Sequence, residues 1–325
     1  MTFNINTWKD AWDASPGPHN KKEYQMLFLK GFCMGSADII PGVSGGTIAF
    51  ITGIYSHWLA AIASINLVFI KRFVSFDWKG ALAEVHVRFL CALLLGIGVA
   101  ILSTARLMHY LITEQPVLTW SLFFGLILAS IFVVGKEIDD WKGSSLAFVG
   151  VGAVSAYVIV GLIPVTTPET WWFILFSGII AICAMVLPGI SGSFILLILG
   201  KYEFITGAIK NPFNVDNIMV MALFGGGCVV GIIGFSRILK FFLSHYRNAT
   251  MGILTGFMIG AMRKVWPWKE VLEAKVIRNK VHVLQEQNIF PAQFDSQVIF
   301  AIALMMVGFA FVMILEKFSQ STRVS

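Results

Sequence analysis

The chain has 325 residues, of which 57% are hydrophobic and only 13% are charged, and its formal net charge is +6. A soluble domain carries about 25% charged residues, so this composition excludes a soluble globular protein and indicates an integral membrane protein. No basic run contains interleaved aromatic residues, which argues against nucleic-acid binding. The positive charge suits the basic cytoplasmic loops of a bacterial inner-membrane protein.

The chain begins with a polar segment, residues 1–23, and continues with a first set of hydrophobic stretches. The polar segment predicts an interfacial tail or a short surface helix, and it does not resemble a signal peptide. The longer apolar stretches approach the roughly 20 residues that a membrane-spanning helix requires. The first half, residues 24–168, contains a broken hydrophobic unit at 24–62, a basic loop at 71–88, and spans near 89–111, 117–135 and 145–164.

The second half, residues 169–325, repeats this order. Its broken unit at 171–209 precedes three further spans, and a long polar insertion, residues 263–296, separates the last two. We therefore expect an all-α polytopic membrane protein. Each half would contain a broken or re-entrant helix hairpin and about three transmembrane helices, which in the second half lie near 217–243, 248–263 and 297–316.

A short motif defines each broken unit. The segment Gly31–Tyr55 is apolar, but its centre, Pro41–Gly46, has the sequence PGVSGG. Proline lacks a backbone N–H and glycine tolerates positive φ, so this centre should stop a helix. The same pattern returns at Gly178–Tyr202, where the centre is PGISGS. Two broken helices at corresponding positions are typical of transporters with internal repeats.

The two halves align at consistent offsets. Pairing Pro41 with Pro188 offsets the broken units by 147 residues and gives 12 identities over Tyr24–Ile62. The next two spans align at an offset of 131 residues, which pairs Arg106 with Arg237. If each broken unit enters and leaves the membrane on one side, each half has an odd number of crossings. The second half would then be inverted relative to the first.

The distribution of basic residues predicts a cytoplasmic N-terminus. In that orientation the outer loops Glu114–Pro116 and Val165–Thr170 carry no lysine or arginine, as the positive-inside rule expects. The insertion 263–296 disagrees, because it would lie outside despite its positive charge. Either it is a folded outer cap over an anionic ligand, which we favour, or the number of crossings is wrong. Its basic residues are Arg263, Lys264, Lys269, Lys275, Arg278 and Lys280.

The breaks are candidates for an anion site. A helix that restarts after a break presents free N–H groups and the positive end of its dipole, and glycines let a ligand approach the backbone. The alternative is that these small residues only permit tight helix packing. The candidate binding residues are Ser44, Gly45, Gly46 and Thr47 in the first half and Ser191, Gly192 and Ser193 in the second.

Asp38 lies beside the first break, and its counterpart in the second half is Met185. An acidic residue within a membrane segment suggests a function, here coupling to a proton or a sodium ion. The alternative is a carboxylate that caps exposed N–H groups. Tyr55, Tyr202 and Glu203 are expected to support the site, although Glu203 could simply flank a helix end. The sequence predicts no cofactor and no metal site.

Arg106 and Arg237 each lie near the end of a span, and the repeat pairs them. The guanidinium group is a planar fork of donors that suits phosphate. An inverted repeat would place one arginine toward each face of the membrane, as a carrier of an anion requires. The alternative is that both side chains only extend toward lipid head groups.

The motif segments ADIIPGVSGGTIAFITGIY and LPGISGSFILLILGKYE resemble the bacterial polyprenyl-phosphate translocase family, over about residues 24–316. The resemblance implies transport of undecaprenyl phosphate, the lipid carrier of cell-wall precursors, from the outer to the inner leaflet. It implies polyprenyl phosphate and the bilayer as partners, and it assigns no mechanism to individual residues. A homo-oligomer stays open.

Two other classes of function stay open on the sequence alone. A carrier or channel for a small soluble anion would use the same site without an opening toward lipid. An intramembrane enzyme acting on a lipid phosphate would need a constellation of titratable residues. The GVSGG segment matches the G-x-S-x-G pattern of hydrolases, but its flanks are membrane helix, whereas that pattern requires a preceding strand.

Overall fold

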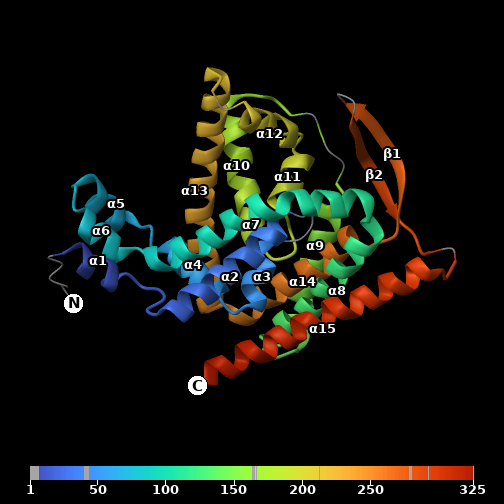
Figure 1. Cartoon of the computed structure of the whole chain (residues 1–325), viewed down its shortest axis with the longest axis horizontal. Helices are drawn as coiled ribbons and strands as arrows, with labels where there is room; N and C mark the ends of the chain where they lie inside the picture. The colour runs from blue at the N-terminus through green and yellow to red at the C-terminus, as the bar shows by residue number, and fades with distance from the viewer. Residues whose placement is uncertain are drawn as a thin grey trace.

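The computed structural model shows a helical bundle with one β-hairpin (Figure 1). Pro41 and Gly42, the predicted breaker residues of the first half, lie outside the residues that the structure describes. The described residues are 7–39, 44–162, 165, 167–211, 213–277, 280–291 and 293–324.

The helices follow the order expected from the hydrophobic stretches. The first half comprises α1 (Trp8–Ala14), α2 (Lys21–Asp38), α3 (Gly45–Ile51), α4 (Tyr55–Ala63), α5 (Leu67–Val74), α6 (Trp78–Glu84), α7 (Val87–Glu114), α8 (Pro116–Gly135) and α9 (Gly143–Val160). The second half comprises α10 (Trp171–Val186), α11 (Gly192–Ile198), α12 (Tyr202–Lys210), α13 (Val215–His245), α14 (Arg247–Val265), β1 (Lys269–Ile277), β2 (Lys280–Asn288) and α15 (Ser296–Val324).

Among the described residues, five helices are long and apolar enough to cross a membrane, namely α7, α8, α9, α13 and α15. Two bent pairs also pass this test when each pair is taken as one unit. The α3–α4 pair bends by 119° and the α11–α12 pair by 117°. The predicted polytopic helical membrane protein is therefore confirmed. The two bends lie between Ile51 and Tyr55 and between Ile198 and Tyr202, beyond the breaks predicted at Pro41–Gly46 and at its counterpart in the second half.

The predicted offsets hold at the level of the structure. An offset of 147 residues carries both ends of α3 and α4 onto those of α11 and α12, and an offset of 131 carries the end of α7 onto that of α13. Close packing matches too. A Cβ added at Gly31 would stand 2.3 Å from the carbonyl oxygen of Leu93, and one at Gly178 would stand 2.4 Å from that of Phe224. The inversion of one half relative to the other stays a prediction.

Helices of the first half pack against helices of the second half. α8 of the first half packs against α15 of the second, and α9 of the first half packs against α14 of the second. Both contacts are close, because a Cβ at Gly125 or Gly256 would stand 2.0 or 2.2 Å from a backbone oxygen across the interface. Neither half buries its surface alone, so a boundary between residues 168 and 169 would divide the sequence repeat but not an independent core.

The first insertion differs from its prediction. The segment expected to be a basic loop contains the end of α5, all of α6 and the start of α7. α1 packs on α6, and Arg88 is buried where its Nε donates to the Ser15 carbonyl oxygen at 2.7 Å. These contacts hold the N-terminal segment in place as a short helix, which is one of the two structures predicted for it.

The second insertion is the only part of the described chain that forms strands. β1 and β2 pair antiparallel, with Lys269 opposite Asn288 and Ile277 opposite Lys280. The segment 263–296 is thus folded, and the hairpin is an addition to the predicted all-α fold. Figure 1 shows the hairpin and the α1, α5 and α6 group at opposite ends of the molecule.

Candidate functional site

The first break is capped by its own chain. Ser44 is the residue before α3, and its Oγ accepts a hydrogen bond from the Gly46 N–H at 3.1 Å. Asp38, at the end of α2, accepts from the Gly45 N–H through Oδ1 at 2.7 Å. The protein's own carboxylate therefore occupies the start of α3, where the sequence predicted a ligand anion.

The first break also contacts the second one directly. Ser44 Oγ lies 3.1 Å from the carbonyl oxygens of both Met185 and Leu187, at the end of α10. The buried Tyr55 hydroxyl donates to the Val186 carbonyl oxygen at 3.1 Å. The last carbonyl groups of a helix have no partner within that helix, and in lipid each unsatisfied group costs several kcal/mol. Side chains of the first half supply the missing partners.

In one hydrogen bond between the two breaks, the second half supplies the donor and the first half the acceptor. The Gly189 N–H in the second break donates to Thr47 Oγ1 at 3.2 Å. Gly189 has φ of +89°, and a Cβ there would stand 3.0 Å from Cα of Met258 in α14. The left-handed backbone and the close approach both require glycine. The two breaks and the middle of α14 thus form one packed centre.

The second break is less polar than the first. Ser191 Oγ and Ser193 Oγ lie 2.7 Å apart and bond to each other. A Cβ at Gly192 would stand 2.6 Å from the Ala181 carbonyl oxygen, so this glycine packs against α10. Tyr202 and Glu203 are exposed at the start of α12. Unlike Tyr55, Tyr202 has no hydrogen bond from its hydroxyl in the described part of the chain.

The two arginines occupy matching places on α7 and α13, and both are exposed. Arg237 donates to the Ile65 carbonyl oxygen at 2.6 Å, beyond the end of α4. Neither guanidinium forms a hydrogen bond with a break residue among those that the structure describes. Their proposed role as phosphate receivers stays a prediction.

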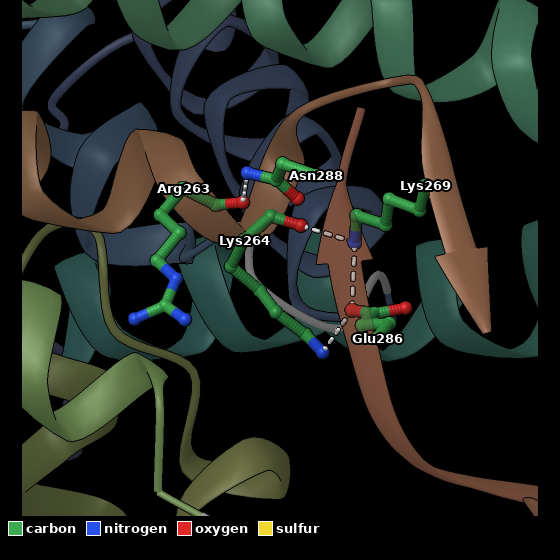
Figure 2. Close-up of polar contacts among 5 residues, drawn as sticks. All are labelled: Arg263, Lys264, Lys269, Glu286 and Asn288. Carbon is green, nitrogen blue, oxygen red and sulfur yellow. Dashed lines mark hydrogen bonds and ion pairs between the residues drawn. The ribbon is translucent and has the colours of Figure 1, made fainter. Parts of the chain in front are cut away.

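A charged cluster that the sequence did not predict as a site lies at the base of the hairpin (Figure 2). Lys264 Nζ and Lys269 Nζ both contact Oε1 of Glu286, at 2.7 and 2.8 Å. Lys269 also donates to the Lys264 carbonyl oxygen at 2.7 Å, at the end of α14. The sequence identified both lysines as basic, but only the hairpin register brings Glu286 to them.

The charges in this cluster stabilise one another. Burial raises the pKa of Glu286, but Lys269 and Lys264 outweigh burial and hold that pKa below its usual range. Burial lowers the pKa of Lys269, although the neighbouring Glu286 opposes this effect. Two lysine side chains therefore share one carboxylate oxygen in this cluster.

A cavity of about 680 Å³ opens beside this cluster. Arg263 lies on its wall, with its guanidinium carbon 4.5 Å from the centroid of the Tyr157 ring. The Arg263 carbonyl oxygen accepts a hydrogen bond from Asn288 Nδ2 at 2.9 Å. The lining residues are Phe124, Tyr157, Ile259, Gly260, Met262, Arg263, Trp266, Leu272, Glu286, Gln287 and Asn288.

These features define a class of protein. Several apolar spans surround two broken helices that meet through hydrogen bonds, and a charged cavity lies along one of the packed helices. This is the architecture of a multi-pass membrane transporter, in which irregular backbone persists because other protein groups satisfy it.

Sequence comparison identifies the family within that class. Residues 34–283 match the family described as undecaprenyl phosphate translocase-like, and the chain belongs to this family. A polyprenyl-phosphate transporter of Vibrio cholerae serotype O1 is 42% identical over 304 residues, which cover 91% of this chain and 97% of the relative. A polyprenyl-phosphate transporter of Staphylococcus aureus is 32% identical over 254 residues, covering 74% and 85%. No solved structure matches the chain.

These relationships agree with the resemblance seen in the two motifs. They indicate a transporter and not an enzyme, so the alternative of an intramembrane lipid-phosphate enzyme is set aside.

Proposed function

We propose that this protein moves undecaprenyl phosphate across the bacterial inner membrane, from the outer to the inner leaflet, for reuse in cell-envelope synthesis. The observation that carries the proposal is the packed centre in which the two broken helices meet, with Ser44 Oγ against the end of α10. A phosphate head group needs polar partners inside the bilayer, because an unpaired charge there is expensive.

In the structure the described residues of the first break, Ser44 to Thr47, already have hydrogen-bond partners within the protein. Passage of the head group therefore requires an exchange of partners, in which the phosphate replaces Asp38 at the Gly45 N–H. Ser44 and Thr47 would leave the second half at the same step. We place the head group between the two breaks, with Ser44, Gly45, Gly46, Thr47, Ser191, Gly192 and Ser193 as its binding residues.

Asp38 gives the exchange a route to ion coupling. A carboxylate displaced by a phosphate is left unpaired in a low-dielectric setting, and uptake of a proton or a sodium ion would neutralise it. The second break has Met185 at this place, so coupling would use the first break alone. Tyr55 would hold the two halves together through its hydrogen bond to the Val186 carbonyl oxygen.

The membrane orientation is part of the proposal. The N-terminus would be cytoplasmic, and the predicted number of crossings would then put the hairpin on the outer face. The hairpin and α1 lie at opposite ends of the molecule (Figure 1). Arg106 and Arg237 would then receive the head group at the two leaflets, as their matching places on α7 and α13 suggest.

Vesicles made with undecaprenyl phosphate in both leaflets test the function. An impermeant phosphatase destroys the accessible lipid phosphate, and continued loss beyond the outer-leaflet pool measures movement between leaflets. We expect wild-type protein to exhaust the whole pool and the Arg106→Ala, Arg237→Ala double variant to slow this about tenfold or more. The matched control is Arg247→Ala, which removes only an exposed ion pair to Glu137.

A parallel measurement separates lipid from small-anion transport. Uptake of inorganic phosphate into the same vesicles should stay at the level of protein-free vesicles. Uptake of inorganic phosphate without movement of lipid phosphate would refute the proposal and favour the small-anion carrier or channel. A normal rate in the double variant would remove the arginines from the mechanism but leave the function intact.

A further inference from the structure

The hairpin-side cavity combines an apolar wall with a basic side chain. Phe124, Ile259, Met262 and Leu272 supply apolar surface, and Arg263 is the basic residue among the described residues that line the cavity. The guanidinium carbon of Arg263 lies over the Tyr157 ring. A guanidinium group held in this way keeps its planar fork of N–H donors available for a phosphate.

The carboxylate on the cavity wall would repel a phosphate if it were unpaired. Glu286 is instead neutralised by Lys264 and Lys269, which contact the same oxygen. Figure 2 shows the Arg263 guanidinium turned away from this group of three, so the guanidinium is not consumed by the ion pairs. The lysines act as positioning residues, because they remove the repulsion without lining the cavity themselves.

The cavity lies close to the packed centre. Ile259 and Gly260 line it, and the preceding residue, Met258, contacts Gly189 of the second break. Arg263 is five residues farther along α14, which places it about 8 Å along the helix axis from Met258. Lys264 also faces α11, with Nζ 5.0 Å from the centroid of the Phe194 ring. A ligand bound at Arg263 would therefore lie close to the second break.

We propose that this cavity is an entry site for the polyprenyl phosphate, in which Arg263 binds the phosphate head group and the apolar wall binds the first isoprene units. The inference rests on the proposed function and adds a binding site to it. It also gives the basic insertion 263–296 a role, because the hairpin supplies one wall of the cavity through Leu272, Glu286, Gln287 and Asn288.

The test measures binding of farnesyl phosphate, a short prenyl phosphate, to the full-length protein in nanodiscs by calorimetry. Arg263→Gln should weaken binding about tenfold to a hundredfold, the range expected for loss of a charge-assisted hydrogen bond. Arg247→Gln, at the other end of α14, should change it less than about twofold. Glu286→Gln should bind as tightly as wild type or tighter, because the change removes a negative charge from the wall.

Two results would overturn the inference. One is equal affinity of wild type and Arg263→Gln for farnesyl phosphate; the other is equal affinity of wild type for farnesyl phosphate and inorganic phosphate, since the apolar wall should favour the lipid. If Arg263→Gln unfolds, Arg263→Lys supplies the test, and loss of the planar fork should still weaken binding severalfold.

Failure of the inference and failure of the function are distinct. Vesicles in which wild-type protein moves undecaprenyl phosphate, but whose Arg263→Gln variant binds farnesyl phosphate normally, would refute the entry site alone. Vesicles in which wild-type protein moves no lipid phosphate would refute the proposed function.

Discussion

The two breaks have nearly the same shape and different chemistry. The helix pairs that follow the two breaks, α3–α4 and α11–α12, bend by 119° and 117°, and their ends match at a single offset. At the first break Asp38 and Thr47 make hydrogen bonds that Met185 and Phe194 cannot make in the second. Ser44 and Tyr55 bond to the end of α10, although their counterparts Ser191 and Tyr202 are the same residue types. The bends share a glycine with positive φ, Gly53 and Gly200, whereas the hydrogen bonds depend both on the positions that differ and on what packs against each half.

The difference shows how the two halves are held together. The end of α10 offers carbonyl groups, and the first break supplies hydroxyl groups to them. Two identical polar breaks would compete for the same partners. An asymmetric pair satisfies its buried groups in one closed arrangement and leaves a single acid at the centre.

The largest expected effect comes from filling the glycines at the two breaks. A Cβ at Gly192 would meet backbone, the Ala181 oxygen at 2.6 Å, whereas a Cβ at Gly45 would meet the movable Asp38 carboxylate at 2.5 Å. Gly192→Ala should therefore lower the free energy of unfolding by about 1–3 kcal/mol, and Gly45→Ala by less. Denaturation in detergent measures both.

Gly207→Ala is the matched control for that pair. Gly207 lies within α12 and has nothing within 4 Å of an added Cβ, so alanine should leave the protein as stable or more stable. Equal losses at positions 45 and 192 would contradict the contrast between a flexible and a rigid neighbour.

Asp38 distinguishes a cap from a coupling group. Asp38→Ala removes the acceptor for Gly45 and should cost about 1–2 kcal/mol, as loss of a helix cap does. Asp38→Asn keeps an acceptor oxygen and should retain most of the stability, yet it should slow lipid movement about tenfold if the carboxylate takes up an ion. Transport by Asp38→Asn at the normal rate would reduce Asp38 to a cap.

Tyr55 and Tyr202 occupy matching positions, so removing one hydroxyl group from each half tests the difference between the breaks. Tyr55→Phe removes the donor to the Val186 oxygen and should cost about 1 kcal/mol. Tyr202→Phe should change stability very little, because that side chain is exposed. Thermal unfolding of the two variants in the same detergent measures the difference. Equal losses of stability would argue that the Tyr55 hydroxyl does not help to hold the two halves together.

The smallest effect concerns pH at the base of the hairpin. The pKa of Glu286 in the folded protein lies below its usual range, because Lys269 and Lys264 outweigh the effect of burial. Its ion pairs therefore contribute stability above that usual range, and the contribution is lost as the pH falls through the lowered value. Hydrogen exchange of β1 and β2, corrected for intrinsic rates, should increase in acid while that of α3 stays constant.

The sequence by itself determined the membrane class, the order of the helices and the two breaks. Long apolar stretches cannot be stable in water, and proline with glycines ends a helix in any context. The sequence repeat predicted matching segments in the two halves, and the ends of α3, α4, α11 and α12 match at its offset. The bends between α3 and α4 and between α11 and α12 were not predicted. Strand pairing in the hairpin and helices at α5 and α6 escaped prediction, because these segments are short and polar or mixed.

Only the tertiary structure decided which polar groups meet. Gly45 and Asp38 are close in sequence, but Ser44 and Met185 are 141 residues apart. Whether a free N–H binds a ligand or the protein itself depends on what packs against it, and no local pattern encodes that partner. The same holds for Glu286, whose neighbours are set by the register of a hairpin and the end of α14.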